Sequence, residues 1–173
     1  VSQVIGKHYF ARPRAVMAVP SGVNETERRS LISTMFDVGM KRTQLIHRSL
    51  AAALGAGLPI DSSYGTLIVD ISAGVTDLGV ISMNRVLVED SVKVGGDAFS
   101  DAIIRHLRRK HNLYIGERTA DELKINLGSA IPRTEQTYMD VTGRNLISGL
   151  PKTMRIYSDD ITEAIDEPLR QLT

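Results

Sequence analysis

The stretch GTLIVDISAGVTDLGVI, residues 65–81, places one carboxylate, Asp70, between an apolar run and a turn of small residues. A turn without bulky side chains lets backbone N–H groups approach an anion, and glycine there permits a positive φ. A carboxylate before the turn repels a phosphate but can hold a hydrated Mg²⁺ that neutralises it. The pattern fits a phosphate-binding turn with Asp70 as a magnesium ligand through water. A plain hairpin with a capping aspartate fits the same residues.

A second turn of small residues, Gly95 and Gly96, comes directly before an expected helix. The N-terminal amides of that helix can also meet an anion. Further on, Asp121 and Lys124 are three residues apart on another expected helix, so an acceptor and a cation share one face. They could clasp a ribose and its charged neighbour, or form an ordinary surface ion pair.

These residues need a layered α/β framework to position them. Residues 14–20 read as a short buried strand, and a helix follows that Asn24 and Glu27 cap and Gly39 ends. Its expected apolar face consists of Leu31, Ile32, Met35 and Phe36. A short strand and a small-residue helix, residues 47–58, come next, and this order indicates an α/β layer architecture.

The segment after residue 65 predicts a three-strand meander over residues 66–70, 76–83 and 86–94. A helix then opens after Gly96 with Phe99, Ile103 and Leu107 on one stripe, while its basic residues face water near the C-terminus. A capping box of Thr119 and Glu122 predicts a helix over residues 120–128. Paired strands and a last helix from Ser158 complete the chain.

Composition narrows the function classes. The 21 basic and 20 acidic residues leave a net charge of +1, which gives no sign of nucleic-acid binding. The absence of cysteine excludes disulfides, thiolate metal sites and a cysteine nucleophile. His106 and His111 are five residues apart, so we expect a solvated helix and its exit loop rather than a metal site.

No apolar stretch approaches the ~20 residues of a transmembrane helix, and no signal peptide is recognisable. The chain starts without methionine and stops inside an expected helix. We therefore expect a piece of a longer protein.

Six ordered motifs are similar to those of one family. They read AVMAVPSGVNETERRS, AAALGAGLPI, GTLIVDISAGVTDLGVIS, SVKVGGDAFSDAII, IGERTADELKINLGSA and TGRNLISGLPKTMRI. Together they resemble the MreB family of bacterial actin-like proteins over essentially the whole chain. The resemblance implies the actin-like ATPase fold, an α/β fold of ribonuclease-H-like domains that close on ATP and Mg²⁺. The chain would be incomplete, because two outer nucleotide motifs of the family have no counterpart.

By that resemblance, three segments belong to the nucleotide site: the phosphate turn, the glycine pair and the segment that grips the nucleoside. Their residues are Ser72, Ala73, Gly74, Val75, Thr76, Gly95, Gly96, Asp121, Glu122, Leu123 and Lys124. The expected domains are residues 1–64 in the first actin-like domain, 65–97 and 162–173 in the second, and an inserted small α+β subdomain at 98–161.

The sequence departs from the family pattern at two places. The turn has Ser72, Ala73 and Val75 where the family has Gly, Gly and Thr, and added Cβ atoms obstruct close backbone approach. The family's water-positioning glutamate corresponds to Arg48. A cation cannot accept a proton from water, so we expect no catalytic acid and impaired hydrolysis. We also expect weak or absent binding of ATP and Mg²⁺, because the resemblance covers only about half of the nucleotide cleft.

The resemblance implies a cytoplasmic protein that forms filaments at the inner face of the cell membrane. These filaments would organise wall synthesis and the rod shape of the cell. The implied partners are further copies of the chain, the membrane surface, and the wall-elongation machinery including a RodZ-like membrane protein, with no nucleic acid. Tyr9 and Phe10, flanked by basic residues, are the expected membrane contact. The same two residues could instead cover the edge of the first strand. The alternative is a nucleotide-independent interaction module of the same fold.

Overall fold

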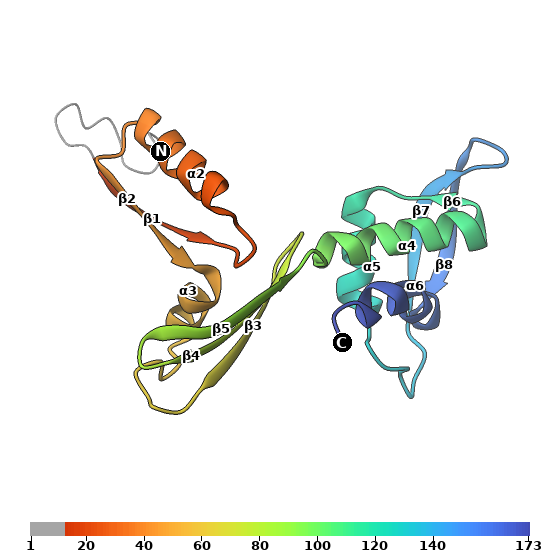
Figure 1. Cartoon of the computed structure of the whole chain (residues 1–173). Helices are drawn as coiled ribbons and strands as arrows, with labels where there is room; N and C mark the ends of the chain where they lie inside the picture. Colours follow the sequence, from red (N-terminus) through yellow and green to blue (C-terminus); the bar gives the residue numbers. More distant parts are fainter. Residues whose placement is uncertain (1–12) are drawn as a thin grey trace. The chain divides into compact units, whose positions relative to one another are not determined.

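The computed structural model describes residues 13–173, and its contacts divide the chain into two compact units (Figure 1). The first unit comprises residues up to Asp70 together with 77–91, and the second comprises 71–76 together with 92–173. The domain boundaries expected from the family resemblance stay a prediction. Tyr9 and Phe10 lie outside the described residues.

The first unit opens with a β-α-β arrangement. Strand β1 (Arg14–Val19) pairs in parallel with β2 (Arg42–His47), and helix α2 (Glu25–Asp37) connects them. The expected capping box is confirmed, because Asn24 and Glu27 exchange two hydrogen bonds of 2.9 Å. Gly39, with a φ of +98°, follows the helix as expected. Helix α3 (Arg48–Gly55) starts directly after β2.

The apolar face expected on α2 exists, but it is not buried. None of the residues of α2 is buried, and the side chain of Phe36 is 62% exposed. Periodicity therefore identified the helix correctly but gave no information about what covers it.

The expected meander is confirmed. Strands β3 (Thr66–Ile71), β4 (Thr76–Ser82) and β5 (Arg85–Val92) form a sheet in the order β3-β4-β5. Met83 and Asn84 have φ values of 49° and 60°, which is the backbone of a tight hairpin turn. A small core of Ala53, Ile60 and Ile81 packs in this unit.

The second unit is a compact α+β body. It contains helices α4 (Gly96–His111), α5 (Glu117–Leu127) and α6 (Ser158–Arg170). It also contains an antiparallel sheet of β6 (Leu113–Tyr114), β7 (Tyr138–Asn145) and β8 (Pro151–Tyr157). The expected strand pair and the helix start at Ser158 are confirmed. The core consists of Ile103, Leu107, Leu113, Ile115, Ala120, Leu123, Leu127, Val141, Ile156, Ile161, Ala164 and Ile165.

Two expectations in this unit are wrong. Helix α5 begins at Glu117 after Gly116, so Thr119 lies inside the helix and caps nothing. His106, which was expected to face solvent, is only 3% exposed because it lies on the side of α4 that packs on α6. Within residues 13–173, no helix is long and apolar enough to cross a membrane.

Candidate functional site

The turn after β3 is closed by its own backbone. The amide of Ser72 donates to the carbonyl oxygen of Val75 at 3.0 Å, and Ala73 and Gly74 are exposed at the tip. The buried hydroxyl of Thr76 donates to the carbonyl oxygen of Val94 at 2.8 Å. The turn therefore has a fixed base and an exposed tip, as a phosphate-binding turn requires.

The two small-residue turns predicted from the sequence lie against each other. The amide of Gly96 donates to Ser72 O at 2.9 Å, and the amide of Asp97 donates to Ala73 O at 2.8 Å. A Cβ atom on Gly95 would overlap both of these carbonyl oxygens, so only glycine permits this approach. Two amides at the start of α4 therefore hold the turn instead of facing an anion.

Lys124 connects α5 to the start of α4. Its ammonium donates to the carbonyl oxygen of Gly96 at 3.0 Å, to the hydroxyl of Ser100 at 2.8 Å and to a carboxylate oxygen of Asp121 at 2.7 Å. The expected shared face of Asp121 and Lys124 is confirmed. The hydrogen bond from Lys124, with a further one from Ser100, lowers the pKa of Asp121 below its ordinary value.

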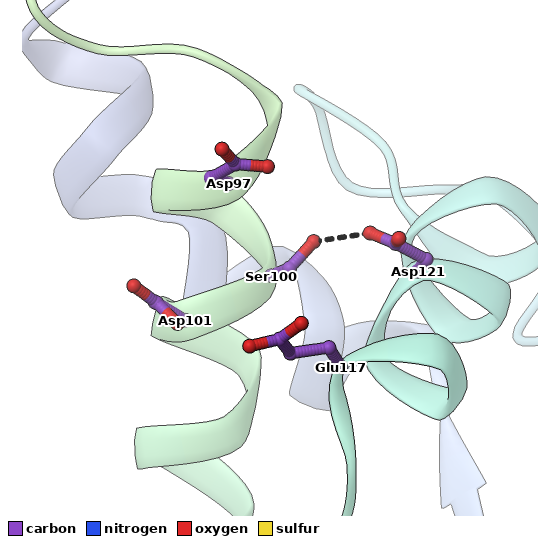
Figure 2. A pocket seen from close by; sticks show the side chains of 5 residues that line it. All are labelled: Asp97, Ser100, Asp101, Glu117 and Asp121. Carbon is purple, nitrogen blue, oxygen red and sulfur yellow. Dashed lines mark hydrogen bonds between the residues drawn. The ribbon is translucent and has the colours of Figure 1, made fainter. Parts of the chain in front are cut away.

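A pocket of about 330 Å³ lies between α4 and α5, and Figure 2 shows the side chains around it. Its lining residues are Asp97, Ser100, Asp101, Glu117 and Asp121. Carboxylate oxygens accept hydrogen bonds from hydroxyl groups and repel phosphate. The pocket therefore has the chemistry of a sugar site and not that of a phosphate site.

The other two residues of the expected nucleoside segment point elsewhere. Leu123 is fully buried in the core, and Glu122 pairs with Arg118 on the surface at 3.2 Å. The contribution of both residues to nucleotide binding stays a prediction.

Sequence reasoning missed four of the pocket residues: Asp97, Asp101, Ser100 and Glu117. A usable signal was present, because Asp97 and Asp101, like Glu117 and Asp121, are four residues apart and share one helix face. Both acidic pairs also begin in the first turn of a helix that follows a glycine.

In the first unit, Arg48 forms an ion pair instead of presenting an acid. Its guanidinium lies 3.3 Å from Asp77 Oδ2, and the carboxylate of Asp77 is fully buried in β4. The other oxygen of Asp77 accepts a hydrogen bond from the Ser21 amide at 3.2 Å. Beside this pair, His47 Nδ1 lies 2.7 Å from Glu89 Oε2. Asp70 is half-buried near the end of β3.

The chain is similar to known proteins both in sequence and in structure. The family described as "MreB/Mbl protein" matches residues 1–173. The cell shape-determining protein MreB of Escherichia coli (strain K12) is 42% identical over 157 residues, covering 91% of this chain and 45% of that protein. Mbl of Bacillus subtilis (strain 168) is 34% identical over 161 residues, covering 93% and 48%.

Solved structures agree with these matches. MreB5 of Spiroplasma citri bound to AMPPNP has a TM-score of 0.84 at 36% identity and covers 91% of this chain and 47% of that chain. The same protein bound to ADP has a TM-score of 0.86 at 35% identity. A MamK double helical filament has a TM-score of 0.76 at 15% identity, which concerns the fold alone. The chain spans about half the length of the curated relatives it matches.

Proposed function

Because the chain belongs to the MreB/Mbl family, we propose that it is a nucleotide-binding, filament-forming subunit of a bacterial actin-like cytoskeleton. Its fold is the actin-like α/β fold, and it covers about half of a full family chain. In this proposal the filament organises cell-wall synthesis and rod shape from the cytoplasmic face of the membrane.

The contact between the two glycine-containing turns is the observation that supports nucleotide binding most strongly. The exposed tip at Ala73 and Gly74 supplies amides for phosphate, and the hydrogen bonds to α4 hold the tip in place. The acidic pocket between α4 and α5 accepts the ribose hydroxyl groups. Asp70 contributes a magnesium ligand through water. The two nucleotide-bound structures of MreB5 support nucleotide binding in the family.

We assign no catalytic acid to the position of Arg48, and hydrolysis is slow or lost. The guanidinium of Arg48 has only N–H donors, so it cannot accept a proton from an attacking water molecule. Its charge is also paired with the buried carboxylate of Asp77. Assembly driven by nucleotide binding, without rapid turnover, is the form of the activity that we propose.

Calorimetry of the purified chain with ATP and Mg²⁺ tests nucleotide binding. Asp121→Ala removes a pocket carboxylate and is expected to weaken a measurable affinity by about tenfold, the loss of one good hydrogen bond. Glu135→Ala, at an exposed loop residue outside the pocket, is the matched control and should leave the affinity unchanged. Equal affinities in the parent chain and both variants would contradict the pocket assignment.

One specific observation favours the second candidate, a nucleotide-independent interaction module. All three N–H groups of the Lys124 ammonium already have protein acceptors. High-speed pelleting separates the candidates. Sedimentation that requires ATP supports the nucleotide-binding filament subunit, and sedimentation that does not depend on nucleotide supports the interaction module.

The membrane part of the proposal rests on sequence alone. Tyr9 and Phe10 are the proposed inserting residues, and a RodZ-like membrane protein is the proposed partner at the surface. Co-sedimentation with anionic vesicles should fall when both aromatics are replaced by serine. Retention that is unaffected by this change would leave only the neighbouring basic residues as the attachment.

A further inference from the structure

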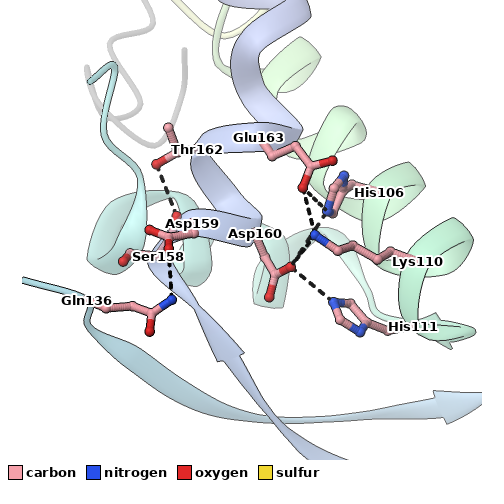
Figure 3. Close-up of polar contacts among 9 residues, drawn as sticks. All are labelled: His106, Lys110, His111, Gln136, Ser158, Asp159, Asp160, Thr162 and Glu163. Atoms are coloured by element: carbon pink, nitrogen blue, oxygen red, sulfur yellow. Dashed lines mark hydrogen bonds and ion pairs between the residues drawn. The ribbon is translucent and has the colours of Figure 1, made fainter. Parts of the chain in front are cut away.

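A cluster of metal-binding side chain types joins α4 to α6 in the second unit, away from the acidic pocket. His106 Nε2 lies 3.9 Å from Asp160 Oδ1 and 3.9 Å from Glu163 Oε2. These three atoms all lie within 4.8 Å of one another, and Figure 3 shows them converging. Small movements of the side chains would bring them to the spacing of ligands around one ion.

His106 points into this cluster without a hydrogen-bond partner. The residue is 3% exposed, and Nε2 makes no hydrogen bond with any part of the chain that the structure describes. A buried polar atom without a partner is costly unless something else satisfies it. A metal ion at this point would supply the missing interaction.

Lys110 presently supplies a positive charge at the same place. Its ammonium lies 2.9 Å from Asp160 Oδ1 and 2.7 Å from Glu163 Oε2. The side chain of Lys110 is 44% exposed, so it can move into solvent and release both carboxylates. His111 Nε2, 3.3 Å from Asp160 Oδ1, is close enough to serve as a fourth metal ligand.

The geometry points to a zinc site: we propose that His106, Asp160 and Glu163 bind Zn²⁺, with His111 as the fourth ligand, when the ion displaces the Lys110 ammonium. Zn²⁺ suits one or two imidazoles combined with carboxylates. A small pocket of about 160 Å³ borders His106 and Glu163, and Arg105 and Arg109 also line it. The bound ion would fasten α4 to α6.

Calorimetric titration of Zn²⁺ into the purified, chelator-treated chain tests the proposal. We expect one saturable site. Lys110→Met removes the competing cation and should tighten binding by about tenfold or more, whereas Glu163→Gln should weaken it by a similar factor. Both side chains are substantially exposed, so these variants keep the fold. Arg108→Met removes a cation from the same turn of α4 and should change nothing, because Arg108 is exposed and outside the cluster.

Two results would overturn the proposal. One is the absence of saturable Zn²⁺ binding in both the parent chain and Lys110→Met. The other is binding that Glu163→Gln and His106→Asn leave unchanged while circular dichroism shows both variants folded. Either result would mean that Lys110 is the permanent cation of a purely structural ion network.

Discussion

At the scale of single residues, the pairing of Arg48 with Asp77 has consequences for both stability and function. Asp77 is fully buried, and a buried carboxylate is tolerated only with compensating charge or hydrogen bonds. The Ser21 amide supplies one hydrogen bond and Arg48 supplies the charge. Arg48, which the family resemblance placed at the position of the water-positioning acid, is therefore expected to stabilise the first unit by compensating Asp77.

Replacing Arg48 by methionine should lower the free energy of unfolding by about 2–4 kcal/mol, because it leaves the Asp77 carboxylate uncompensated. Urea denaturation measures the change. Arg29→Met, which breaks an exposed pair with Glu25 in α2, should cost no more than about 0.5 kcal/mol. Adding Asp77→Asn to Arg48→Met should recover part of the loss. Equal effects of the two arginine replacements would contradict the assigned role.

The carboxyl group of Asp121 should titrate below its ordinary pKa of 3.8, because the ammonium of Lys124 and the Ser100 hydroxyl favour the charged form. A lowered pKa in the folded state means that this group stabilises the fold above pH 3.8 and loses that contribution as pH falls through the folded pKa. Carboxyl NMR titration should show the pKa rising toward 3.8 in Lys124→Met. The exposed lysine variant Lys152→Met is the control, and a pKa that Lys124→Met does not move would refute the coupling.

At the scale of elements, the start of α4 holds the turn that follows β3 in place. Gly95 has an extended backbone, so its requirement for glycine comes from close approach and not from a special φ. The turn and the helix are joined through main-chain atoms alone, by two hydrogen bonds. Side-chain replacements in the turn can therefore leave its position intact.

Gly95→Ala should displace the turn, because the new Cβ would overlap the carbonyl oxygens of Ser72 and Ala73. The expected cost is about 1–3 kcal/mol in unfolding free energy, together with loss of any measurable ATP binding. Gly116→Ala is a matched control, since no atom lies within 4 Å of the Cβ it would add. Unchanged nucleotide binding in folded Gly95→Ala would show that the turn is not part of the site.

The elements were predictable where local chemistry decides them. The meander, the capping box at Asn24 and the two small-residue turns all follow from short-range signals, and the structure has them. The start of α5 was not predictable from the capping signal at Thr119, because the helix already begins at Glu117, after Gly116, and so contains Thr119. The burial of His106 and the pairing of Arg48 depend on α6 and β4, which are remote in sequence, and no local pattern contains that information.

At the scale of the whole molecule, the two units differ in how much core they contain. Among residues 13–173, the largest cluster of the second unit includes twelve buried hydrophobic residues, whereas that of the first includes three. Burial of apolar surface is the main stabilising term in a fold. The second unit should therefore be the more stable part of this chain.

Hydrogen exchange followed by mass spectrometry should show this difference directly. Amides of α4 and α6 are expected to exchange much more slowly than those of α2, which has no buried residue. Equal protection of α2 and α4 would contradict the expectation and would mean that the exposed face of α2 is covered in solution.

The ammonium of Lys124 donates hydrogen bonds to Gly96, Ser100 and Asp121 at once, so one group is bonded both to the helix that holds the turn after β3 and to the wall of the acidic pocket. A ligand that enters the pocket and competes for Asp121 changes the bonds left to Gly96. A ligand at the turn that shifts Gly96 likewise changes the bonds left to Asp121. Such coupling is reciprocal by thermodynamic necessity, since each ligand must alter the affinity of the other by the same factor. In the proposed site, sugar and phosphate would therefore be sensed together, and a molecule that offers both would have an advantage over either one alone.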